Sequence, residues 1–166
     1  MDTHFRSLPW MTLFPLRLMI AALPCLAIAS PARADERASA ATLLPAYRQE
    51  CGSCHVPYPP GLLPAASWQR LLDHLPQHFG NDASLDAATL KELSTWLAAH
   101  AARSRRAMEP PPQDRITRSA WFRHEHDEVP QAAWTRPAVK SPANCTACHA
   151  QADQGDFSED RVRIPR

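Results

Sequence analysis

The sequence predicts an all-α fold with long loops. Apolar residues recur at helical spacing in two segments, 65–79 and 85–102. Proline is abundant (17) and glycine scarce (4), which favours short helices that are interrupted often. Strand patterns, in which apolar and polar residues alternate, are weak throughout. With 166 residues, the chain has room for one domain or two small ones.

The first half of the chain is expected to hold three helices, of which the first covers 40–50 and begins only at Pro45 if proline takes the first helical position. The second covers 65–79, and Gly80 is expected to stop it. Its apolar residues are Trp68, Leu71, Leu72, Leu75 and Phe79. Pro76 should kink this helix or split its last turn.

The third helix is predicted over 85–102, with Ser84 as its N-cap. Its apolar stripe consists of Leu90, Leu93 and Leu97. The second half of the chain is less regular. We expect a short helix over 119–129 and a further helix that Asn144 caps and Gly155 ends.

Residues 1–34 have the pattern of an export signal. An apolar run over 18–29 follows basic residues, and residues 32–34 have the small-x-small form of a signal-peptidase site. We expect cleavage after Ala34, which would remove Cys25 with the signal. The apolar run is short for a membrane-spanning helix, so a retained anchor is the weaker alternative.

The charge of the chain is close to balanced, at +1 formally. This composition does not suggest a disordered, fibrous or nucleic-acid-binding protein. Cleavage would leave 15 basic and 16 acidic side chains, or −1, because it removes three arginines and one aspartate from 18 and 17. This balance favours a partner with a basic surface.

Two CxxCH motifs stand at 51–55 and 145–149 and contain every cysteine that remains after cleavage. The motif supplies two thiols for thioether bonds to a porphyrin and an adjacent histidine that reaches the iron. The predicted attachment residues are Cys51, Cys54, Cys145 and Cys148, and the predicted axial ligands from the motifs are His55 and His149. The sequence therefore predicts two covalently bound haem c groups.

Two other uses of the CxxC pairs are alternatives. The four thiols could form a zinc site, although neither histidine would then be needed. A redox dithiol would require a strand-helix-strand context that the sequence lacks. With haem at both motifs, the expected domains are an N-terminal haem lobe (35–102), a proline-rich linker (103–114) and a C-terminal haem lobe (115–166).

The sixth ligand of each iron separates a closed electron carrier from an open ligand binder or enzyme. Met108 is the only methionine after cleavage, and we interpret it as a linker residue. Five histidines remain as candidates: His74, His78, His100, His124 and His126. An ordinary histidine on an apolar face is more often a hydrogen-bonded core residue, but two irons in so small a chain favour ligation.

Helical phase favours His78 for the first haem and His126 for the second. If 65–79 is helical, His78 lies on its apolar face, whereas His74 lies off the edge. His126 follows Phe122 by four residues on one face, and His124 points the other way. His100, near a helix end, is interpreted as a solvated residue.

The chain resembles the dihaem cytochrome c (DHC) family of bacterial periplasmic electron carriers. The resemblance rests on CGSCH (51–55), YPPGLLPAASW (58–68), HFGNDASL (78–85), RITRSAWF (115–122), EHDEV (125–129), NCTACH (144–149) and the tail GDFSEDRVRIP (155–165). It implies two small lobes of class I-like c-type cytochrome character and bis-histidine, low-spin haems. His55 would pair with His78, and His149 with His126.

The resemblance also implies redox proteins as partners, among them an oxygen-binding monohaem cytochrome (sphaeroides haem protein) and a membrane b-type cytochrome. We expect a periplasmic electron-transfer protein that is not an enzyme, binds no nucleic acid and is not stably inserted in a membrane after cleavage. The alternative is a dihaem peroxidase or small-molecule reductase with one iron open or able to open. Such an enzyme would need an acid–base residue over the iron, for which Glu125 and His124 are candidates.

Overall fold

The structure, a computed structural model, describes residues 43–103 and 108–166. The predicted export signal, its cleavage site and Cys25 lie outside the described residues, as does part of the predicted linker. All described residues belong to one compact unit of the chain. Within them no helix is long and apolar enough to cross a membrane.

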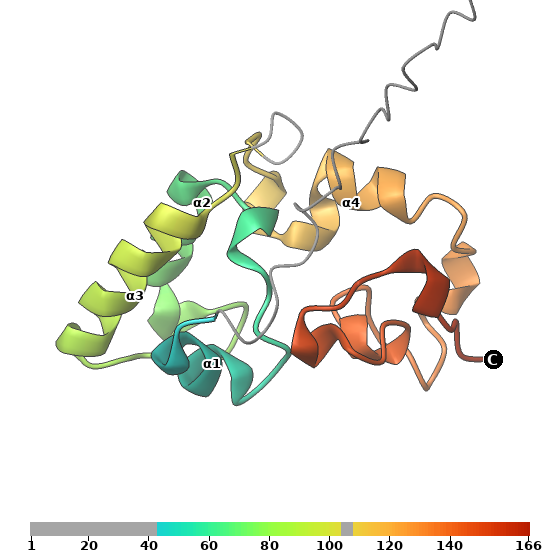
Figure 1. Ribbon diagram of the computed structural model, residues 1–166, viewed down its shortest axis with the longest axis horizontal. Coiled ribbons are helices and arrows are strands. Elements are labelled where there is room, and N and C mark those ends of the chain that lie inside the picture. The colour runs from blue at the N-terminus through green and yellow to red at the C-terminus, as the bar shows by residue number, and fades with distance from the viewer. Residues whose placement is uncertain (1–42, 104–107) are drawn as a thin grey trace, which may run out of the picture. The chain divides into compact units, whose positions relative to one another are not determined.

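Four α-helices account for the regular structure of the described residues (Figure 1). They are α1 (Pro45–Gly52), α2 (Ala65–Asp73), α3 (Ala87–His100) and α4 (Ala120–Glu125). Short 3₁₀ turns occupy many of the connections: η2 (Pro60–Leu62), η3 (Leu75–Gln77), η4 (Pro112–Asp114), η5 (Ile116–Arg118), η6 (Gln131–Ala133), η7 (Cys145–Ala147), η8 (Ala152–Gln154) and η9 (Glu159–Arg161). The described part of the chain contains no strand, and its one isolated bridge joins His78 to Asn81. The prediction of an all-α fold with long loops is confirmed.

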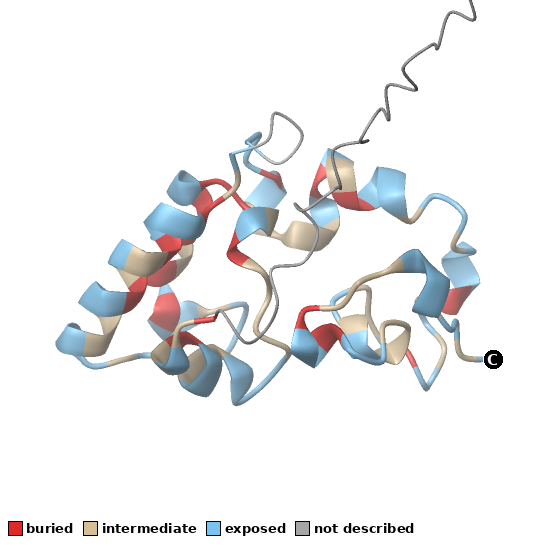
Figure 2. Cartoon of the chain, in the orientation of Figure 1, coloured by how far each residue is buried: buried red, intermediate tan, exposed pale blue. Residues whose placement is uncertain are grey.

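Helices α1, α2 and α3 enclose the main core. The buried positions of α2 and α3 lie where these two helices pack side by side (Figure 2). Tyr47 of α1 is 1% exposed, and its ring packs against Trp68 and Trp96 at centroid distances of 6.3 and 5.1 Å. Its hydroxyl donates to the carbonyl of Tyr58 at 2.7 Å, so the core fixes the loop that follows the first CxxCH motif.

The first helices begin and end for local reasons. Pro45 is at the start of α1, as predicted, because a helix needs no amide donor there. The predicted second helix is shorter than expected: α2 ends at Asp73, and Pro76 lies in the separate turn η3. Proline removes a backbone donor and clashes with the preceding turn, which explains the split.

The predicted cap of the third helix was wrong. Asp86, not Ser84, is the N-cap of α3, and its carboxylate accepts from the amides of Ala88 and Thr89 at 2.9 and 3.0 Å. The Ser84 hydroxyl instead donates to the carboxylate of Asp82. A carboxylate accepts two amide hydrogen bonds at once, which favours the later start.

The C-terminal part has little regular structure, as predicted. Ser119 caps α4 by accepting from the amide of Phe122 at 2.9 Å, and the helix ends at Glu125 rather than at 129. The second motif begins in the short turn η7, and the helix expected there does not form. Asn144 makes no side-chain cap, because its side-chain amide donates to the carbonyl of Val139 at 3.0 Å instead. Gly155 (φ 74°) follows η8.

Side chains join the parts of the chain that carry the two motifs. Arg70 of α2 donates to both carboxylate oxygens of Asp114, at 2.9 and 2.6 Å. Asp114 belongs to a tight turn in which Gln113 and Asp114 both have positive φ (60° and 53°). The Tyr58 hydroxyl donates to the carbonyl of Ala143 at 2.8 Å.

Candidate functional site

The first CxxCH motif brings its histidine opposite His78. The ring centres of His55 and His78 are 6.3 Å apart, and the ring planes differ by 24°. The Nδ1 of His55 donates to the carbonyl of Val56 at 2.8 Å, which directs its Nε2 away from the backbone. The ring of Tyr58 stacks on His55 at 4.8 Å.

His78 does not lie on a helix, contrary to the reasoning that selected it. It follows η3, and the next two residues, Phe79 and Gly80, have positive φ (50° and 97°). A hydrogen bond of 3.0 Å from the amide of Asn81 to the carbonyl of His78 closes this turn. The tight turn, and not helical phase, therefore turns His78 toward His55.

The Nδ1 of His78 is buried, and no described residue forms a hydrogen bond with it. The pKa of His78 is lowered, first by burial and then by the nearby charges of His55 and Arg115. A neutral imidazole is the form that can donate a lone pair to a metal.

The second motif forms a similar pair. The ring centres of His126 and His149 are 6.2 Å apart, and the planes differ by 72°. The Nδ1 of His126 donates to the carbonyl of Phe122 at 2.9 Å, and the two rings stack at 4.1 Å. Phe122 and His126 thus lie on one face of the helix, as their i, i+4 spacing in the sequence indicated. Trp134 packs at 5.8 Å from His126.

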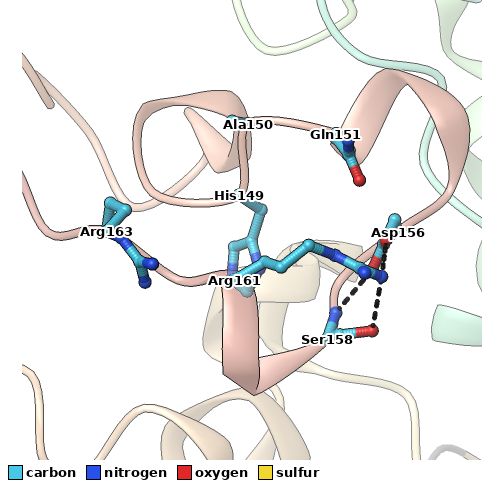
Figure 3. A pocket seen from close by; sticks show the side chains of 7 residues that line it. All are labelled: His149, Ala150, Gln151, Asp156, Ser158, Arg161 and Arg163. Carbon is cyan, nitrogen blue, oxygen red and sulfur yellow. Dashed lines mark hydrogen bonds and ion pairs between the residues drawn. The ribbon is translucent and has the colours of Figure 1, made fainter.

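His149 lies beside the aromatic ring of Phe157 and at the edge of a cavity with charged residues on its wall. Its ring lies 5.4 Å from that of Phe157, and it lines a cavity of ≈ 180 Å³ (Figure 3). On the cavity wall Arg161 bonds to Asp156 and Ser158, as the dashed lines in Figure 3 show. The pKa of His149 is lowered, mainly by burial and also by His126, so this ring is also predominantly neutral at neutral pH.

No disulfide joins the four motif cysteines, which are partly buried or exposed. Burial raises the pKa of Cys51 and of Cys145 to about 11, and it also raises the pKa of Cys148. A redox dithiol needs a lowered thiol pKa, so these values disfavour that alternative. Within the described ranges, no three or more Cys, His, Asp or Glu side chains gather as metal ligands, as the four-thiolate zinc alternative would require.

The geometry of both pairs fits a shared iron. A bond of about 2 Å from a metal to an imidazole nitrogen, plus roughly 1.1 Å from that nitrogen to the ring centre, places two rings on one metal about 6 Å apart. The observed separations are 6.3 and 6.2 Å. Each pair comes with two thiols from its own motif, which is the donor set that covalent haem requires.

The remaining candidates do not join either pair. His74 and His100 each bond through Nδ1 to a carbonyl of their own helix, of Arg70 and of Trp96. His100 also stacks on Trp96 at 4.7 Å. His124 is exposed on α4, and Met108 is 55% exposed.

Two aromatic contacts were not foreseen from the sequence. Phe157 packs on His149, and Arg115 lies over the ring of Phe79 at 4.1 Å. Neither contact follows from helical or strand periodicity, because Phe157 lies beyond the turn η8 from His149 and Arg115 comes 36 positions after Phe79.

A helical fold with two CxxCH motifs, each accompanied by a facing pair of histidines, defines a c-type cytochrome with two haem sites. The profile of the family described as dihaem cytochrome c matches residues 47–157. The chain belongs to this family. Two haem c groups are therefore covalently bound, as predicted, and Cys51, Cys54, Cys145 and Cys148 are the thiols consistent with their attachment.

Solved structures support the same conclusion. The diheme cytochrome type c from Shewanella baltica OS155 is 41% identical, covers 73% of this chain and 92% of its own, and superimposes with a TM-score of 0.65. The diheme cytochrome c from Rhodobacter sphaeroides is 40% identical, with 70% and 98% coverage and a TM-score of 0.63. No curated protein sequence matched significantly. The family supports a haem c electron-transfer role.

Proposed function

We propose that this protein is a periplasmic cytochrome that passes electrons between redox partners through two bis-histidine, low-spin haems. The observation that carries the proposal is the pair of separations, 6.3 Å for His55 with His78 and 6.2 Å for His126 with His149. Each matches two imidazoles that share one iron. The export pattern of residues 1–34 supports the location.

Each haem supplies a one-electron iron couple when bound. The chain's residues would hold and enclose it: the thiols would anchor the ring, and the paired histidines would ligate the iron. A histidine on each side keeps the potential lower than a methionine would and leaves no open position for a substrate. This arrangement supports electron transfer as the function.

The proposed partners are redox proteins with a basic surface. The expected negative charge of the mature chain favours a basic surface on the partner, with more effect on the association rate than on affinity. The resemblance to the family favours an oxygen-binding monohaem cytochrome and a membrane b-type cytochrome. Both would be tested by electron-transfer kinetics as ionic strength is raised, where the rate should fall.

Optical and low-temperature EPR spectra of the purified holoprotein, with a pyridine haemochrome assay, test the ligation. We expect two haems per chain and only low-spin bis-imidazole signals. A high-spin component in the resting protein would refute closed irons and favour an enzyme or ligand binder.

A further inference from the structure

His78 and His126, the histidines that face the motif histidines, differ in the number of contacts that fix their side chains. His126 lies at the C-terminal end of α4, and its Nδ1–H bonds to the carbonyl of Phe122 at 2.9 Å. Its ring stacks on Phe122 at 4.1 Å with an angle of 20°, and Phe122 is 7% exposed. Trp134 packs on it as a second ring, at 5.8 Å. One hydrogen bond and two aromatic rings thus fix its orientation.

His78 lacks these supports. Its Nδ1 is buried without a hydrogen-bond partner among the described residues. Apart from His55, the ring that packs on it there is that of Phe79, at 4.8 Å, and Phe79 is 43% exposed. A hydrogen bond to the outer nitrogen of a ligating histidine fixes the ring and makes it a better donor. His78 is therefore both the less constrained and the weaker ligand.

The backbone around His78 is also less regular than the backbone around His126. Phe79, which carries a Cβ, has φ 50°, a conformation that residues other than glycine disfavour. The turn is closed by the hydrogen bond from Asn81 to His78, and a bond of 2.9 Å from the amide of Ala83 to the carbonyl of Leu75 spans it.

There is space beside His78 to receive a displaced ring. A cavity of ≈ 210 Å³ is lined by His78 together with Leu71, His74, Gln77 and Phe79, among others. The volume of an imidazole is well below this value. His126 lines neither this cavity nor the cavity of ≈ 180 Å³ beside His149.

We propose that the haem held by His55 and His78 exchanges its distal histidine for a neutral diatomic ligand such as carbon monoxide, while the haem held by His149 and His126 does not. The inference rests on the proposed bis-histidine ligation. In the exchange the bond from iron to His78 breaks and a bond from iron to the carbon of the ligand forms. The iron stays ferrous, and no electron or proton is transferred.

Titration of the dithionite-reduced holoprotein with carbon monoxide tests this, with His78→Ala and His126→Ala as a matched pair. We expect the wild type to bind one carbon monoxide per chain, slowly, because His78 must leave first. His78→Ala should still bind one, at least about tenfold faster, since the position is already open. His126→Ala should bind two, one fast and one at the wild-type rate. No binding to the wild type, or two ligands on His78→Ala and one on His126→Ala, would overturn the inference.

A measurement on the wild type covers the case in which a variant does not fold. In the diamagnetic ferrous protein, the ring protons of axial histidines have NMR signals shifted upfield by the porphyrin. Carbon monoxide should abolish the shifted signals of His78 and leave those of His126. Loss of the His126 signals instead, or retention of both sets, contradicts the inference. A high-spin signal before carbon monoxide is added would refute the proposed function itself, which separates the two failures.

Discussion

The hydroxyl of Tyr58 donates a 2.8 Å hydrogen bond to the carbonyl of Ala143, two residues before the attachment cysteine Cys145. The bond joins the loop after the first motif to the loop before the second across 85 positions of the chain. The ring of Tyr58 meanwhile stacks on His55 at 4.8 Å. One side chain therefore contacts both haem sites, and burial raises its pKa to about 12, so the hydroxyl stays protonated and remains a donor.

Tyr58→Phe should lower the free energy of unfolding by about 0.5–1 kcal/mol, since the variant keeps the ring and loses one exposed hydrogen bond. Guanidinium unfolding of the holoprotein measures this. Tyr47→Phe is the comparison: it leaves the carbonyl of Tyr58 without its core donor and should cost about 1–3 kcal/mol. An unchanged stability for Tyr58→Phe, or a smaller loss for Tyr47→Phe, would contradict this assignment.

Ser119→Ala should destabilise the protein by about 1 kcal/mol, because Ser119 is the N-cap of α4 and satisfies the amide of Phe122. Ser84→Ala is the matched control. Its hydroxyl bonds to Asp82 and caps no helix, so the change should stay within about 0.5 kcal/mol. Equal losses in the two variants would show that α4 does not depend on its cap.

The caps illustrate what sequence alone could and could not decide. Both serines precede a predicted helix, and only the structure shows that Asp86 reaches the amides of α3 first. The start of α1 at Pro45 and the interruption at Pro76 were predictable, since proline acts through its own covalent geometry.

The motif residues were also evident from spacing, but the environment of each distal histidine was not. His78 was selected by the phase of a helix that ends at Asp73, five residues before it. What brings it to His55 is a turn with two positive φ angles, for which Phe79 gives no local signal. The bond from Tyr58 to Ala143 was equally hidden, because contacts between distant segments leave no periodicity in the sequence.

Asp114→Asn should destabilise the protein at neutral pH and do so less at about pH 2. Hydrogen bonds from Arg70 hold the pKa of Asp114 below its usual 3.8. A carboxylate with a lowered folded pKa contributes stability above its unfolded pKa and loses that contribution as pH falls through the folded pKa. The difference between wild type and variant should therefore shrink in the acid range below pH 3.8.

Guanidinium unfolding at the two pH values measures the effect of Asp114→Asn. Asp73→Asn serves as the control, because that carboxylate accepts from Gln69 on the same helix and joins no second segment. It should cost less at neutral pH than Asp114→Asn does. A difference between Asp114→Asn and wild type that persists undiminished at about pH 2 would mean that the charge of Asp114 is not what stabilises the contact with Arg70.

His126→Met should raise one of the two reduction potentials and leave the other nearly unchanged. Methionine opposite histidine favours ferrous iron more than a second histidine does. The effect should be confined to the haem attached at Cys145 and Cys148, because His126 faces His149 and no ring of the first pair. Potentiometric titration followed optically gives both potentials.

His100→Met is the control for that substitution, since His100 is exposed at the end of α3 and stacks on Trp96. It should shift neither potential. A rise in both potentials for His126→Met would indicate a general loosening of the fold. Two unchanged potentials, with both haems still low-spin, would mean that a residue other than His126 completes the second iron site, and His124, two positions away on the exposed side of α4, would be the first to replace.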